Sequence, residues 1–118
     1  MNLKTVAAYI ILMLCMFVAG TAFSQNMCNS DICVVQFNAS WNESNSVDYL
    51  GKLTDCEVMN ISIDEGTYQS DYKIVVVPTI IIFNGKEVER FQANIMMEME
   101  ATRKDVQGVV DEIIYSDF

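Results

Sequence analysis

The 118-residue chain contains no histidine. Imidazole is the usual general base near neutral pH and the commonest transition-metal ligand in proteins. Its absence excludes Ser-His-Asp triads and nearly every common transition-metal site. We therefore expect the protein to bind neither a metal nor a cofactor.

Basic residues are also scarce, with seven Lys and Arg against 16 Asp and Glu, for a net charge of −9. Nucleic acids and anionic membrane surfaces are recognised by clustered Lys and Arg side chains, and this chain has no such cluster. We therefore expect no nucleic-acid partner. The acidic charge is typical of a small protein that must stay soluble.

Charge is missing altogether from Val6–Phe23, an apolar stretch that follows Lys4 and precedes the small residue Ser24. A basic start, an apolar middle and a small-residue end predict a secretory signal peptide over residues 1–24. The protein would then be exported, to a periplasm or outside the cell. The alternative is an uncleaved anchor over residues 6–23, because the stretch reaches the lower limit of about 17 residues for crossing a membrane. Only in that case do we expect contact with a membrane.

Residues 25–118 have room for one domain with a modest core. They contain three cysteines, Cys28, Cys33 and Cys56. Disulfides are possible in an exported protein, and an odd count leaves at least one thiol free or paired between chains.

Four elements are predicted in the first two thirds of this domain. The β-branched run at 32–37 is typical of a strand buried on both faces. Val47, Leu50 and Leu53 have helical spacing and predict a helix over about 42–54. Alternation at 56–63 predicts a second strand, and a short polar helix follows at 65–72, where Tyr68 and Tyr72 share one face.

The last third begins with a predicted hairpin of strands 79–83 and 87–91 around Asn84-Gly85, the strongest short-range hairpin signal. A helix ends the chain, with an apolar stripe over residues 106–114. Thr102 and Asp105 could cap it, or Asn94 could begin a longer helix, which we slightly favour.

The predicted order is β-α-β-α-β-β-α. A helical crossover makes the first two strands parallel, so the fold class is α/β with a mixed four-stranded sheet and helices on both faces.

Several motifs in this order resemble the thioredoxin family, from about Val34 to Ile114. They are "VVQFNASW", "SID", "YKIVVVPT" and "IIIFNGKEV". The resemblance implies a thioredoxin-like fold. Between the predicted signal peptide and Ile32 there are too few residues for the strand and helix that open a full thioredoxin. The resemblance therefore implies a trimmed core of the fold, without that strand and helix.

The chain departs from the family at its reactive motif, W-C-x-x-C, where it has Trp41-Asn42-Glu43-Ser44-Asn45. The buried acid of the family falls at Gln36. Disulfide exchange needs a thiolate nucleophile and a resolving thiol, and asparagine supplies neither. Asn42 would instead serve as a helix N-cap. The resemblance therefore implies a degenerate active site with no catalytic residue, and we expect the protein not to be an enzyme.

The family also has a cis proline beside its reactive pair, and Pro78 in Val77-Pro78-Thr79 corresponds to it. We expect the Val77–Pro78 bond to be cis, with the backbone of Val77 facing an extended partner. The extra segment after Phe91 would place Met96 and Met97 on the border of the same groove, where thioether side chains suit adaptable apolar contacts. The alternative is that these methionines only cover the end of the sheet.

Three functions remain open. The first is a redox-inactive module that binds a peptide or protein in this groove. The second is an oxidoreductase that acts through Cys28, Cys33 or Cys56. The third is an exported accessory domain with no groove function. For a structural disulfide, Cys28–Cys33 and Cys33–Cys56 are both conceivable, and the first is slightly preferred because bridges between adjacent strands tend to be strained.

Overall fold

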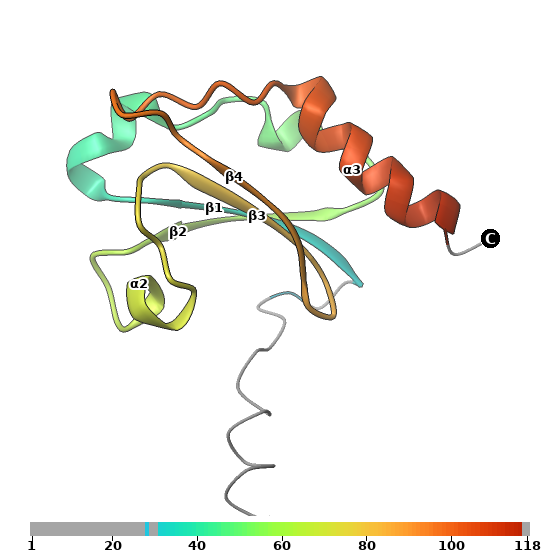
Figure 1. Ribbon diagram of the computed structural model, residues 1–118, viewed down its shortest axis with the longest axis horizontal. Helices are drawn as coiled ribbons and strands as arrows, with labels where there is room; N and C mark the ends of the chain where they lie inside the picture. Colours follow the sequence, from blue (N-terminus) through green and yellow to red (C-terminus); the bar gives the residue numbers. More distant parts are fainter. Residues whose placement is uncertain (1–27, 29–30, 117–118) are drawn as a thin grey trace, which may run out of the picture.

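The computed structural model describes Cys28 and residues 31–116 (Figure 1). The segment at 6–23, for which we predicted a signal peptide or an anchor, lies outside these residues. Within them, no helix is both long enough and apolar enough to cross a membrane.

Four strands form one mixed sheet in the order β2-β1-β3-β4. The strands are β1 (Ile32–Asn38), β2 (Glu57–Ser62), β3 (Thr79–Asn84) and β4 (Glu87–Gln92). β1 runs parallel to β2 and antiparallel to β3, and β3 and β4 form the hairpin predicted around Asn84-Gly85. The predicted α/β class and the mixed four-stranded sheet are confirmed.

Helices cover the two faces of this sheet (Figure 1). On one face, Val34, Ile80 and Ile82 pack with α3 (Arg103–Ser116) through Val106 and Val110. On the other face, a second apolar cluster is covered by α2 (Tyr68–Asp71) and includes Val35, Phe37, Ile81, Tyr68 and Tyr72. Successive side chains of a strand point to opposite faces, so β1 and β3 supply both clusters.

The helix predicted over residues 42–54 is wrong. Two short 3-10 turns, η1 (Ser40–Asn45) and η2 (Leu50–Lys52), replace it. Leu50 and Leu53 are buried in the α3-side cluster, so their apolar spacing reports burial without a continuous helix.

Polar side chains of β1 explain why the helix does not form. An α-helix would bond the Ser46 N–H to the Asn42 carbonyl, but that N–H donates to the Glu43 carbonyl at 3.0 Å, and the Asn42 carbonyl accepts Asn38 Nδ2 at 3.0 Å. The Val47 N–H, next along the chain, donates to Gln36 Oε1 at 2.9 Å. These side chains offer the backbone an alternative to helical bonds.

The longer C-terminal helix, beginning at Asn94, is also wrong. α3 starts at Arg103, after a capping box in which Thr102 N–H donates to Asp105 Oδ2 (2.8 Å) and Asp105 N–H donates to Thr102 Oγ1 (3.3 Å). Asn94 instead closes a turn of its own, since its side-chain oxygen accepts the N–H groups of Met96 (2.9 Å) and Glu98 (3.1 Å). Because this turn holds the backbone after Asn94 in a non-helical conformation, no helix begins at Asn94.

Candidate functional site: an apolar groove at the end of the sheet

Three loops meet beyond the end of β1 and enclose a cavity of about 220 Å³. Trp41 follows β1, Val75 and Val77 precede β3, and Ile95 and Met97 follow β4. Ile63, which follows β2, and Gln69 of α2 also line this cavity, which we call the Trp41 groove. The sheet order brings the three loops together, because β1 and β3 are neighbours and β4 lies next to β3.

Large apolar side chains around the Trp41 groove are exposed to solvent. Trp41 is 67% exposed, Val75 79% and Ile95 99%, and Met96 and Met97 are exposed beside them. Isolated apolar residues are common on surfaces, but a contiguous patch of this kind marks an interaction site more often than it fills a structural need.

The proline loop has the backbone that the resemblance implies. The Val77–Pro78 peptide bond is cis. Thr79 is fully buried, and its hydroxyl donates to the Val76 carbonyl at 2.7 Å. The Pro78 carbonyl accepts the Ala93 N–H at 3.0 Å, which joins this loop to the end of β4.

The backbone of Val77 differs from the expectation in one respect. Its carbonyl oxygen does not face an open groove alone, because Asn42 Nδ2 donates to it at 3.3 Å. One lone pair of this carbonyl is therefore already used within the protein.

Asn42 is the centre of a buried amide network. It is only 5% exposed, and its side chain also donates to Asn38 Oδ1 at 3.1 Å and accepts from Asn45 Nδ2 at 2.9 Å. The prediction that Asn42 is a helix N-cap is wrong, because Ala39 holds the cap position of η1 and no side chain caps the turn. The network instead ties the end of β1 to the proline loop.

Glu43 and Ser44 of the motif, and Gln36 at the position of the family's buried acid, do not line the Trp41 groove. Glu43 and Ser44 are exposed. Gln36 is almost fully buried, and its side chain donates to Asn60 Oδ1 at 2.8 Å while it accepts the Val47 N–H. This neutral amide holds the loop after η1 and has no proton to transfer.

The three methionines of the extra segment take different places. Met97 lines the Trp41 groove, and its φ of 63° follows from the tight turn that Asn94 closes. Met96 is exposed at the rim and does not line the cavity. Met99 packs against the α3-side core and is structural.

Two charged side chains that the sequence did not identify, Arg90 and Asp64, fix the loops around the groove by hydrogen bonds to them. Arg90 donates to the carbonyls of Tyr72 (2.7 Å) and Lys73 (2.9 Å), just before Val75, and pairs with Glu87. No local sequence signal identifies these bonds, since they join β4 to a loop 17 and 18 residues earlier.

Asp64 fixes the start of η1 in a similar way. Its Oδ2 accepts the hydroxyl of Ser40 and the Ser40 N–H (2.8 Å). These hydrogen bonds, the hydroxyl first, hold the pKa of Asp64 below its ordinary value. The exposed ring of Trp41 follows directly on this anchored residue.

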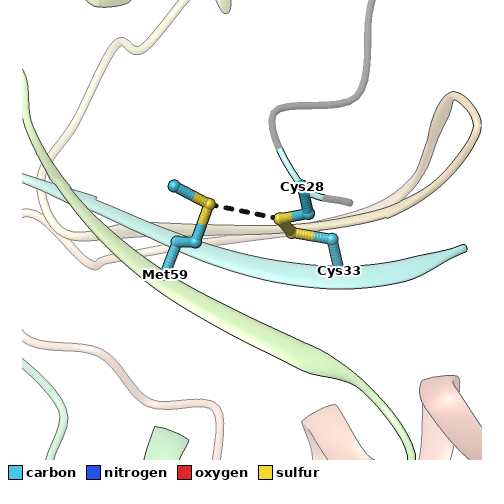
Figure 2. Close-up of a disulfide and its surroundings, with 3 residues drawn as sticks. All are labelled: Cys28, Cys33 and Met59. Atoms are coloured by element: carbon cyan, nitrogen blue, oxygen red, sulfur yellow. Dashed lines mark hydrogen bonds between the residues drawn. A yellow bond between two sulfur atoms is a disulfide. The ribbon is translucent and has the colours of Figure 1, made fainter. Parts of the chain in front are cut away.

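The cysteines lie away from the Trp41 groove. A disulfide joins Cys28 to Cys33, with 6.0 Å between the Cα atoms, and Met59 Sδ lies 3.3 Å from Cys28 Sγ (Figure 2). Cys28 is 8% exposed and Cys33 fully buried, in the α2-side cluster at the opposite end of β1 from Trp41. Cys56 is a free thiol.

The Cys56 thiol is not set up as a nucleophile. Burial, followed by the charges of Asp55 and Asp111, raises its pKa. A raised pKa lowers the fraction of thiolate near neutral pH, and the thiolate is the reactive form.

The fold has counterparts among solved structures. No family model matches the sequence, and no curated protein does. A mutant thioredoxin from Halobacterium salinarum NRC-1 superposes with a TM-score of 0.55 at 24% identity, over 71% of this chain and 75% of that one. Thioredoxin from Fasciola hepatica gives 0.50 at 24% identity, over 69% and 79%. Thioredoxin O2 from Arabidopsis thaliana, in its oxidised state, gives 0.50 at 16% identity, over 84% and 87%. The chain has a thioredoxin-like fold.

Proposed function

We propose that this chain is an exported binding module with a thioredoxin-like fold, without disulfide-exchange activity, that holds a peptide or protein in the Trp41 groove. The observation that carries the proposal is the group of exposed apolar side chains around one cavity, contributed by three separate loops. A core needs none of these side chains, whereas a bound partner would remove them from water.

The residues beside the groove support the lack of exchange activity. At the two positions that the family resemblance assigns to cysteine, Asn42 and Asn45 bond to each other through their amides. Neither can form a thiolate or a mixed disulfide. Gln36, at the position of the buried acid, is an amide as well.

An oxidoreductase that acts through Cys28 and Cys33 is the second candidate, and the disulfide between them is the observation in its favour. Exchange requires an attacking thiolate to reach one sulfur of the bond. Cys33 is fully buried and Cys28 nearly so, and the neighbouring Met59 adds an apolar contact. Their burial favours a structural disulfide.

The partner we infer is neutral or basic, with a large apolar side chain for the groove. The net charge of −9 repels acidic proteins and speeds association with basic ones. Trp41 is the natural anchor, since tryptophan is enriched among the residues that dominate binding energy.

Partner capture tests this function. We expect immobilised protein to retain a partner from the host's exported fraction, and Trp41→Ala and Met97→Glu to lose it. Truncating a dominant residue costs about 2 kcal/mol, or roughly thirtyfold in affinity. Tyr115→Ala is a matched control, because it removes a similarly exposed aromatic side chain from α3. Trp41 is the only tryptophan, so a blue shift of its emission on adding the purified partner reports binding directly.

If Trp41→Ala and Met97→Glu both fold normally and keep every partner that the unaltered protein captures, the Trp41 groove is not the binding site.

A further inference from the structure

β2 is an edge strand with an outward row of backbone groups. It is first in the sheet order and pairs with β1. The Ile63 N–H donates to the Asn38 carbonyl of β1, and alternate residues of a strand point the same way. The N–H and C=O groups of Val58, Asn60 and Ser62 therefore point away from β1.

This edge lacks the features that normally block strand addition. Natural edge strands are interrupted by proline, by lysine or by a bulge. The sequence of β2, "EVMNIS", contains neither residue, and its register with β1 continues over six successive pairs. Along the described part of the chain, the outer edge can accept a further strand.

A pocket of about 640 Å³, lined mostly by polar residues, adjoins this edge on the α3 side of the sheet. It exists because residues 42–54 form two short turns and leave the ends of β1 and β2 uncovered. Its lining includes Gln36, Glu43, Asp48, Asn60 and Ser62, none of which lines the Trp41 groove. A strand added beside β2 would project alternate side chains over this pocket.

The charges around the outer edge of β2 favour a basic partner. Glu43 and Asp48 are exposed carboxylates of the pocket, and no Lys or Arg lines it. Acidic residues also lie at both ends of β2, namely Asp55 and its first residue Glu57 at one end, and Asp64 and Glu65 beyond the other. A second copy paired antiparallel through β2 would bring these like charges together, which is destabilising.

We propose that β2 and the adjoining pocket form a second docking site, which takes an extended basic segment of another protein as a fifth strand. Val58, Asn60 and Ser62 supply the main-chain hydrogen bonds. Glu43 and Asp48 receive Lys or Arg side chains of the added strand. Main-chain bonds give such a strand its affinity, and the pocket for alternate side chains gives its specificity.

A synthetic peptide of alternating lysine and valine is the probe, with a peptide of alternating glutamate and valine as its control. We expect the lysine peptide to slow hydrogen exchange of the Val58, Asn60 and Ser62 amides by about tenfold or more at saturation. Two N-methylated versions, one blocked at the lysines and one at the valines, should differ, because only one set of N–H groups faces β2.

Variants separate this site from the Trp41 groove. Glu43→Gln with Asp48→Asn should weaken binding of the lysine peptide by about five- to tenfold at low salt, because it removes two exposed ion pairs, each of which is weak and screened by salt. Glu89→Gln with Glu112→Gln removes two exposed carboxylates elsewhere and should change nothing. Trp41→Ala should also leave peptide binding unchanged, whether or not the groove is a binding site.

Three results would overturn the inference. The glutamate peptide could bind as well as the lysine peptide, or both N-methylated peptides could bind equally. The three amides could also be protected without peptide. Protection that rises with protein concentration would assign the edge to a second copy, and protection independent of concentration would assign it to this chain itself.

Discussion

The two ends of β1 differ in chemistry and in access to solvent. At its start, Cys33 is bonded to Cys28 inside an apolar cluster that solvent barely reaches. At its other end, Asn42 and Asn45 form an amide network beside an open apolar groove. Cysteine is thus present inside a closed apolar cluster and is absent beside the open groove, where Asn42 is buried and Asn45 is partly exposed. The comparison favours stability as the role of the disulfide and recognition as the role of the groove.

Restoring sulfur at the open end gives the largest expected effect. We expect the unaltered protein not to reduce insulin disulfides with dithiothreitol as electron donor, and Asn42→Cys with Asn45→Cys to do so measurably. The two side chains already meet at 2.9 Å, so the introduced thiols can form a reducible disulfide beside the Trp41 groove, with the partly exposed position 45 as the one nearer solvent.

The single variant Asn42→Cys is the control, because it lacks a resolving thiol and should not turn over. Clear turnover by the unaltered protein, lost in Cys28→Ala with Cys33→Ala, would contradict the comparison and favour the oxidoreductase.

Removing sulfur from the closed end should have a moderate effect on stability alone. Opening the short loop between Cys28 and Cys33 is expected to lower the free energy of unfolding by about 2 kcal/mol, on the chain-entropy estimate. Urea unfolding of Cys28→Ala with Cys33→Ala measures this loss, with Cys56→Ser as the control for removing a thiol. The emission of folded Trp41 should not change, since the groove lies at the opposite end of β1. A changed emission spectrum would show that the two ends are coupled.

The smallest effect concerns the carboxylate that anchors η1. Hydrogen bonds from Ser40 hold the pKa of Asp64 below its ordinary value of about 3.9. The ionised form is thus favoured in the folded protein, so its contribution is present above that ordinary value and is lost as pH falls through the lower, folded-state pKa. We expect Asp64→Asn to flatten the fall in the urea midpoint below about pH 4.

Glu65→Gln, at the adjacent exposed position, should leave that slope as it is in the unaltered protein. Equal slopes for Asp64→Asn and the unaltered protein would show that the bonds to Ser40 add no stability.

Much of the architecture could be read from the sequence because its signals are local. The β-branched run of β1, the Asn84-Gly85 turn and the apolar stripe of α3 each specify one element through neighbouring residues. The start of α3 was available too, in the Thr102–Asp105 capping box. The prediction of a longer helix was wrong because the Asn94 side chain hydrogen-bonds within a turn. Apolar periodicity alone cannot distinguish such a turn from the start of a helix.

What the sequence by itself determined is therefore the order of the four strands, the presence of helices on both faces of the sheet and the absence of thiols from the motif at Trp41. Only the tertiary structure decided that residues 42–54 are not helical, because Asn38 and Gln36 on β1 take the backbone groups that a helix would use. It likewise assembled the groove, since Trp41, Val75 and Ile95 come from loops far apart in the chain and meet only where three strands end side by side.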